Sequence, residues 1–311
     1  MNNASTLTAV HYRRRIKPEF WLVVLGAALW GVDPLFRIIL LNSLTSTQIV
    51  LLEHLILFLV AAPVLWRHRA ELRGLKAAHL GALLFISWGG SALATILFTQ
   101  GLAHGDLNVV LLLQKLQPLF AIILARYLLK EKLPRLFGNL VVLALAGTYL
   151  LTFGWTLPVG GLSDFVQMGS VLSIGAALLW GGSTVMGRYM LGKMSYETVT
   201  ALRFILALPL LIVITSLEGQ GWSFPAEMSR KGLVLLNLVL QALLPGLLSL
   251  LVYYKGLSGI KASYATLAEL SFPMVGVLIN WVVFHQMITM PQAIGFILIW
   301  LTLYLISRQR E

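Results

Sequence analysis

Six charged residues stand inside long apolar stretches of this sequence, where a charge is costly. An ionisable group near the centre of a bilayer is unfavourable by several kcal/mol, so it normally faces a bundle interior or a water-filled cavity and has a partner. Such charges could bind a charged or zwitterionic small molecule, or could hold helices together as ion pairs. The six residues are Asp33, Arg37, Glu53, Lys115, Arg203 and Glu269.

Four of these charges have a structural or gating interpretation. Asp33 and Arg37 are four residues apart, so they can pair on one face of a helix. Glu53 and Arg203 fall on equivalent positions of the internal repeat described below. They could form an interhelical pair or a gate latch, and ordinary packing is the alternative.

Lys115 and Glu269 stand three and four residues before two prolines, Pro118 and Pro273, that the pattern places inside helices. A proline inside a membrane helix frees a backbone carbonyl, which neighbours or a cavity must satisfy. A mutual ion pair explains both charges. In the alternative, Lys115 holds the carboxylate of a zwitterion and Glu269 holds its ammonium. We predict that all four residues bind substrate.

Two tryptophans extend this candidate site. Trp30 and Trp180 lie inside apolar runs beside glycines, where an indole could stack on an aromatic substrate or hold a cation. Packing or contact with lipid is the alternative, and it applies equally to Trp88. Tyr254, in a repeated segment described below, completes the predicted substrate-binding set.

The composition sets the class of protein. Of 311 residues, 58% are hydrophobic and 11% charged, whereas soluble domains carry about 25% charged residues. This excludes a soluble enzyme, a disordered regulator and a nucleic-acid binder, and it predicts an all-α polytopic membrane protein. The apolar runs predict ten transmembrane helices, at 20–41, 47–66, 78–99, 106–129, 134–154, 165–187, 195–217, 232–254, 262–284 and 290–307.

The sequence lacks the residues and motifs that mark several kinds of catalytic and metal site. There are no cysteines, which excludes disulfides, thiolate nucleophiles and cysteine-ligated metals. The sequence has no P-loop, no HExxH and no GxSxG motif. We therefore expect no ATP-driven pump, no catalytic residues, no cofactor and no metal.

The basic residues predict an orientation. With the N-terminus in the cytoplasm, 18 of the 23 Lys and Arg residues fall on the cytoplasmic side and two on the other side. The positive-inside rule then places both termini in the cytoplasm. The N-terminal segment 1–19 is cytoplasmic in this arrangement, and a connecting loop at 155–164 faces outward.

Two halves of the sequence resemble each other, at 20–154 and 165–307. Each contains five predicted helices, an odd number, so the second half must enter the membrane from the opposite side. Inverted repeats of this kind are common among secondary transporters, with the substrate site at the repeat interface. The matched elements are Gly26-Ala-Ala-Leu-Trp30-Gly31 with Gly175-Ala-Ala-Leu-Leu-Trp180-Gly181, Phe98-Thr-Gln-Gly101-Leu102 with Tyr253-Tyr254-Lys255-Gly256-Leu257, Pro118 with Pro273, and Gly90 with Pro245.

These elements resemble the drug/metabolite transporter superfamily, as two EamA-type repeats. The Trp-Gly pairs resemble the first-helix motif of each half, and Lys130-Glu131 resembles the acidic element after the fourth helix. Overall, the chain is most similar to the bacterial exporters of aromatic amino acids (YddG-like). The resemblance implies a multi-pass protein of the bacterial inner membrane that exports aromatic or hydrophobic amino acids, or similar amphipathic metabolites, by alternating access.

Two departures from the family pattern leave ion coupling open. Gln286 stands where the second half would carry an acid, and the second helices differ in charge at Glu53 and Arg203. Two further functions stay open: a carrier for cationic drugs or sugar nucleotides, and an intramembrane enzyme that acts on a lipid carrier.

Overall fold

The computed structural model describes residues 18–104, 107–157, 167–222, 224, 227–283 and 285–309, and all their regular elements are helices. Most of the predicted N-terminal segment 1–19 and of the connecting loop 155–164 lies outside these ranges. Nine helical segments of the described chain are long and apolar enough to cross a membrane, and a tenth apolar helix, Phe137–Phe153, is shorter. Together they match the ten predicted helices.

The first half forms the first five spans. Its helices are α1 (Pro18–Trp30) and α2 (Asp33–Leu41), α3 (Ser46–Arg67), α4 (Ala77–Leu84), η2 (Phe85–Leu93) and α5 (Ala94–His104), α6 (Leu107–Gln114) and α7 (Gln117–Leu128), and α8 (Phe137–Phe153). A short 3-10 turn, η1 (Arg69–Leu72), follows α3.

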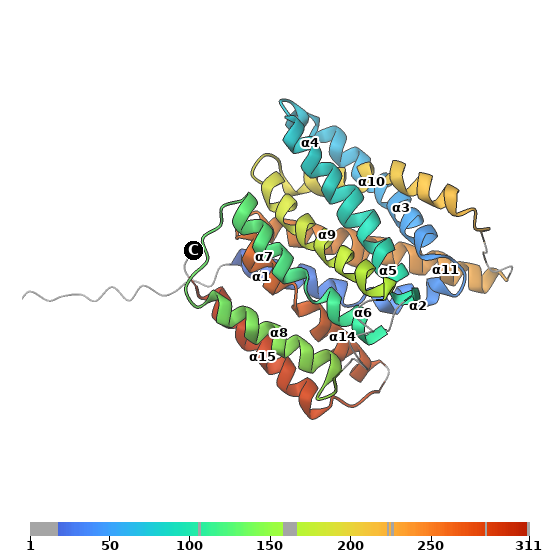
Figure 1. Cartoon of the computed structure of the whole chain (residues 1–311). Coiled ribbons are helices and arrows are strands. Elements are labelled where there is room, and N and C mark those ends of the chain that lie inside the picture. The colour runs from blue at the N-terminus through green and yellow to red at the C-terminus, as the bar shows by residue number, and fades with distance from the viewer. Residues whose placement is uncertain are drawn as a thin grey trace, which may run out of the picture.

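The second half repeats this order. Its helices are α9 (Met168–Met190), α10 (Tyr196–Glu218), α11 (Met228–Gln241), η4 (Ala242–Leu248) and α12 (Ser249–Leu257), α13 (Ala262–Ala268) and α14 (Ser271–Val282), and α15 (Met290–Ser307). The colours of Figure 1 show that helices of the two halves alternate through the bundle.

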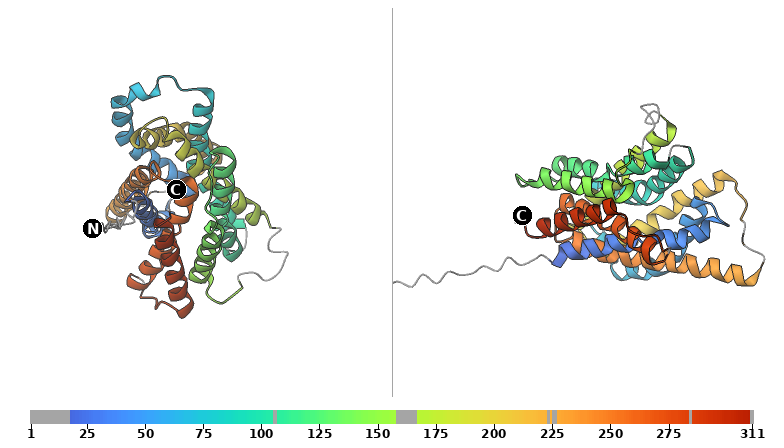
Figure 2. Two further views of the ribbon diagram at one scale, coloured as in Figure 1. Left: turned by 90° about the vertical axis from the view of Figure 1, so that its left-hand side faces the viewer. Right: turned by 90° about the horizontal axis from the view of Figure 1, so that it is seen from below.

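The two halves interlock. Helix α3 packs on α10, α8 on α15, α1 on α12 and α5 on α9, and each of these pairs joins one half to the other. The α8–α15 pair lies along one edge of the bundle (Figures 1 and 2). A Cβ atom at Gly147 of α8 would lie 3.0 Å from the carbonyl oxygen of Gly295 of α15, so small residues set this spacing.

Three spans break within the membrane and restart at a proline. Pro34, Pro118 and Pro273 stand in the first turns of α2, α7 and α14, where a missing N–H costs no helical hydrogen bond. The sequence placed Pro118 and Pro273 inside spans four and nine, where they lie, but each stands in the first turn of a new helical segment and not in the middle of a continuous helix. The segments α6 and α13 end at Gln114 and Ala268, because a proline has no N–H to donate and its ring clashes with the carbonyl four residues earlier.

Spans three and eight stay continuous but widen to π-helix. Gly90 lies in η2 and Pro245 in η4, and shifting the bounds of η2 by the repeat offset of 155 gives 240–248, which contains all of η4. Gly90 and Pro245 therefore form a matched pair, as the sequence predicted, but they widen their helices and do not break them. Wide turns of this kind are frequent at functional sites.

Candidate functional site

A cavity of about 660 Å³ lies between the two halves. This volume falls within the usual range for small-molecule sites, about 300–1,000 Å³. All eleven residues that the sequence assigned to binding or gating line it, namely Trp30, Asp33, Arg37, Glu53, Lys115, Pro118, Trp180, Arg203, Tyr254, Glu269 and Pro273.

The cavity extends toward one end of the bundle. Its lining reaches Leu41 and Ser46, which flank the α2–α3 turn, and also Thr99. The opposite end is filled by buried side chains near the start of α1 and the ends of α9 and α12, including Phe20 and Met190. The cavity therefore approaches one face of the bundle and is closed from the other.

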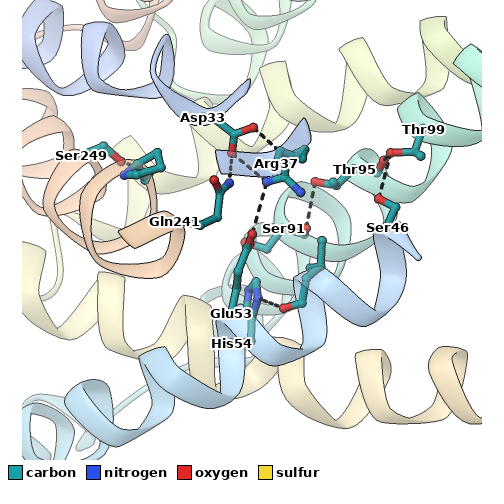
Figure 3. Close-up of polar contacts among 12 residues, drawn as sticks. Asp33, Arg37, Ser46, Glu53, His54, Ser91, Thr95, Thr99, Gln241 and Ser249 are labelled. Carbon is teal, nitrogen blue, oxygen red and sulfur yellow. Dashed lines mark hydrogen bonds and ion pairs between the residues drawn. The ribbon is translucent and has the colours of Figure 1, made fainter. Parts of the chain in front are cut away.

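The break between α1 and α2 positions a first polar group, which we call the Arg37 cluster: Asp33, Arg37, Glu53 and Gln241. Arg37 donates to both oxygens of Asp33, at 2.6 and 2.7 Å, and to Glu53 at 3.4 Å. Gln241 of α11 donates to Asp33. Figure 3 shows the four side chains directed toward one another. One guanidinium thus joins two carboxylates.

The partners in this cluster are partly those that the sequence predicted. Asp33 and Arg37 form the ion pair expected from their spacing. Glu53 pairs with Arg37, and among the described residues no ion pair within 4.0 Å joins Glu53 to Arg203. The interhelical pair considered for Glu53 and Arg203 is therefore not formed in this structure.

A second polar group, which we call the Glu269 cluster, contains Glu269, Gln117, Thr184 and Tyr253. Glu269 lies between α13 and α14 and is 4% exposed. It accepts hydrogen bonds from Gln117 at 2.7 Å, from Thr184 at 2.9 Å and from Tyr253. All three donors are neutral, and they come from three different helices.

Two cations line the cavity without an ion pair among the described residues. Arg203 donates to the hydroxyls of Ser91, Ser183 and Tyr254 at 2.7, 3.2 and 2.8 Å. Lys115, between α6 and α7, places its ammonium 4.8 Å from the centre of the Phe272 ring. The mutual pair considered for Lys115 and Glu269 is absent from the ion pairs of the described chain.

Aromatic pairs stand on both sides of the cavity. Trp30 lies 5.0 Å from Tyr253, and Trp180 lies 5.4 Å from Phe98, measured between ring centres. Each pair joins the two halves. Trp88 differs, because it lies outside the cavity lining and its indole N–H donates to the carbonyl of Leu206 at 2.8 Å.

Glycines bring the aromatic helices against the broken ones. A Cβ atom at Gly31 would lie 2.7 Å from the carbonyl oxygen of Phe272, and one at Gly181 would lie 2.8 Å from that of Gln117. These two contacts are equivalent under the repeat. They hold Trp30 and Trp180, one residue earlier, beside the helix restarts at α14 and α7.

Sequence reasoning missed several lining residues. Gln117 and Thr184 carry no charge, and their role appears only when the fold brings them to Glu269. Phe98 and Tyr253 belong to the two repeated segments already matched, and that match was the available signal. Phe272 carries no repeat signal, because its counterpart is Gln117.

The formal charges that line the cavity balance. Asp33, Glu53 and Glu269 oppose Arg37, Lys115 and Arg203. Buried charge without compensation is strongly unfavourable, so this cavity suits a neutral or zwitterionic ligand. The described residues contain no cluster of three or more metal-ligating side chains.

Comparison with known proteins gives the family. The EamA-like transporter family matches residues 17–153 and again 167–308. A curated relative, the riboflavin transporter ImpX of Fusobacterium nucleatum subsp. nucleatum, is 34% identical over 295 residues, which cover 92% of this chain and 96% of the relative. A crystal structure with 18% identity superposes with a TM-score of 0.76 over 93% of this chain and 96% of its own, which shows a shared fold.

These matches decide between the broad functions left open by the sequence. A family match over both halves and a relative named as a transporter indicate a multi-pass membrane transporter of small metabolites and not an enzyme that acts on a lipid carrier. The repeated motifs, the ten spans and the cavity between the halves agree with this assignment. The chain belongs to the EamA-like transporter family.

Proposed function

We propose that this protein carries a neutral, planar aromatic metabolite of the flavin class, with riboflavin as the lead candidate, by alternating access. The observation that carries the proposal is the cavity itself. It combines aromatic rings from both halves with a formal charge balance of zero. A flat, uncharged ring system can stack there without leaving a buried charge unpaired.

The relative supports the same class of substrate. ImpX is named a riboflavin transporter, and the 34% identity extends over nearly all of both chains. Polar donors along the cavity, including Arg203 and Lys115, would suit the carbonyl oxygens of a flavin ring. Cationic drugs and sugar nucleotides fit less well, because either would add charge to a balanced site.

Export of an aromatic amino acid is the second candidate. The ammonium of Lys115 has no ion pair among the described residues and could hold a substrate carboxylate. Glu269 already accepts three hydrogen bonds, so it has little capacity left for a substrate ammonium. This difference favours the flavin class over a zwitterion.

We further propose that the protein lies in a bacterial inner membrane with both termini in the cytoplasm, on the strength of the basic residues. The cavity would then approach the outer face, where the α2–α3 turn lies. Reporter fusions at Gly74, between spans two and three, and at Gly160, between the halves, should report opposite compartments. The same compartment for both would contradict this topology.

The substrate is tested with purified protein in liposomes. We expect saturable exchange of radiolabelled riboflavin across the membrane, inhibited by unlabelled riboflavin and unaffected by tryptophan or phenylalanine in excess. Exchange does not depend on the natural direction of transport. Exchange of tryptophan without exchange of riboflavin would support the amino acid candidate instead.

A further inference from the structure

Glu269 is buried without a cation beside it. The other two carboxylates of the cavity, Asp33 and Glu53, both contact Arg37. Glu269 is 4% exposed and has no ion pair within 4.0 Å among the described residues. Its charge is therefore held by direct hydrogen bonds, and Arg203 acts on it only from a distance, without ion-pair contact.

One of these hydrogen bonds crosses between the two halves of the chain. Gln117 begins α7 of the first half, whereas Glu269 lies between α13 and α14 of the second half. Thr184 and Tyr253 belong to the second half, on α9 and α12. Rocking of one half against the other would separate Gln117 from Glu269 and leave its two partners from the second half in place.

Such a separation changes which form of the carboxyl group is favoured. Donors that point at a buried carboxylate stabilise its ionised form, and loss of a donor favours the neutral acid. Among titratable and charged groups, α12 presents Tyr253 and Tyr254, α10 presents Arg203, and the α6–α7 break presents Lys115. Of these, only Tyr253 bonds directly to Glu269 in the described structure.

We propose that Glu269 is the proton-binding group that couples substrate transport to a proton gradient. The carboxylate takes up one H⁺ from one aqueous side to form the carboxylic acid when Gln117 withdraws. It releases that H⁺ to the other side when the contact re-forms, so one proton crosses in each cycle and no electrons move. The inference deepens the proposed function, on which it rests.

The test uses liposomes that hold a trapped pH-sensitive dye. With the wild-type protein, a riboflavin gradient should change the internal pH. Glu269→Gln should abolish the pH change measured per riboflavin molecule moved, because an amide cannot take up a proton near neutral pH, although it can still bond to Thr184 and Tyr253. Glu269→Asp should retain part of the pH change, and Glu227→Gln, an exposed carboxylate on the surface, should leave it intact.

Two results would overturn the inference. One is riboflavin movement by wild-type protein with no change in internal pH. The other is a full pH change in Glu269→Gln, particularly if Glu53→Gln abolishes it, which would place the proton in the Arg37 cluster. Should Glu269→Gln fail to elute as a folded species, Glu269→Asp decides the question, because a shortened carboxyl group should reduce the pH change and shift the carboxylic acid C=O band described below, and an unaltered pH change and band would reject the proton site.

A measurement without substrate separates this inference from the choice of riboflavin. Infrared difference spectra between alkaline and acidic pH should show a carboxylic acid C=O band in wild-type protein that Glu269→Gln lacks. Failure of riboflavin exchange with this band present would reject the substrate and retain the proton site. Identical difference spectra for both proteins would reject the proton site whatever the substrate is.

Discussion

The Arg37 cluster and the Glu269 cluster line the same cavity and stabilise their carboxylates in different ways. Each buries carboxylate charge between the halves. In the first, a guanidinium contacts two carboxylates, whereas in the second three neutral donors surround one. Removing a charge from an ion-paired group is costly, while neutral donors can be exchanged for a proton or a ligand. The comparison indicates that the Arg37 cluster keeps its ion pairs and has a structural role, whereas the Glu269 cluster can exchange its hydrogen-bond partners.

The largest effect is expected at the centre of the Arg37 cluster. Arg37→Leu removes the only cation in ion-pair contact with Asp33 and Glu53 in the described chain. Loss of one partner from a fully buried pair costs about 3–5 kcal/mol, and these partly buried pairs should lose less than that but still lower the unfolding temperature in detergent clearly. Arg203→Leu is the matched control, because Arg203 contacts hydroxyls only, and it should lose less. Equal losses would erase the distinction between the clusters.

A triple variant sharpens the same point. Asp33→Asn, Arg37→Gln and Glu53→Gln together remove all three charges, so no unpaired charge stays buried. Its stability should exceed that of Arg37→Leu, since balanced removal avoids the penalty of isolated carboxylates. A triple variant no more stable than Arg37→Leu would show that the ion pairs are not the source of the loss.

Substitutions in the aromatic pairs test whether substrate binds beside the Glu269 cluster. Trp30→Ala and Trp180→Ala should each weaken riboflavin binding several-fold, because stacking contributes about 0.5–1.5 kcal/mol beyond burial. Quenching of riboflavin fluorescence by the purified protein measures this. Trp281→Ala is the control, since Trp281 lies on α14 outside the cavity lining. A similar loss in the control would indicate general damage to the fold.

A smaller effect is expected between Lys115 and Glu269. Because each has other partners, Lys115→Met and Glu269→Gln should alter stability additively, within about 0.5 kcal/mol. The double variant and both single variants complete the thermodynamic cycle in thermal unfolding. A coupling energy well above this value would support the direct ion pair between Lys115 and Glu269 that the sequence analysis considered.

The smallest effect concerns a carboxylate outside the membrane. Burial would raise the pKa of Glu71, but hydrogen bonds from His68, from the backbone N–H of Ser195, and from the hydroxyls of Thr198 and Ser195 lower it from 4.5 to about 2. The pKa is depressed in the folded state, so Glu71 stabilises the fold above its unfolded value and this contribution is lost as pH falls from about 4.5 toward 2.

The unfolding temperature between pH 5 and pH 3 checks this expectation. Wild-type protein should lose slightly more stability across this interval than Glu71→Gln, which has no carboxyl group to titrate. Glu227→Gln, at a carboxylate that is 63% exposed, should behave as wild-type protein does. The same slope for all three proteins would mean that Glu71 does not stabilise the start of α10, where it accepts hydrogen bonds from Ser195.

The membrane spans and the contacts within one helix could be predicted from the sequence, because they depend on residues that are close together in the chain. Apolar length sets the spans, and the i,i+4 spacing brought Asp33 to Arg37. The helix break before Pro34 was not predicted, although proline chemistry explains it. Its counterpart in span six is continuous, with Thr184 in the place of Pro34.

The partners across the cavity could not be predicted in the same way. Gln117 and Glu269 are 152 residues apart. Glu53 forms its ion pair with Arg37 and not with Arg203, which occupies the equivalent position in the second half. Which side chains pair across the cavity depends on how each helix is rotated about its axis and on how closely neighbouring helices pack. Close contacts at Gly31 and Gly181 set those positions, and they arise only in the assembled bundle.

The paired π-helical segments have a consequence for insertions and deletions. A π turn accommodates one more residue than an α turn, while the helix on either side keeps its facing. Deleting one residue within Phe85–Leu93 or Ala242–Leu248 would tighten the helix there without turning α5 or α12 away from the cavity. One deletion elsewhere in these spans would rotate everything beyond it by about 100°. Chain length should therefore vary more freely at these two segments than along the rest of spans three and eight.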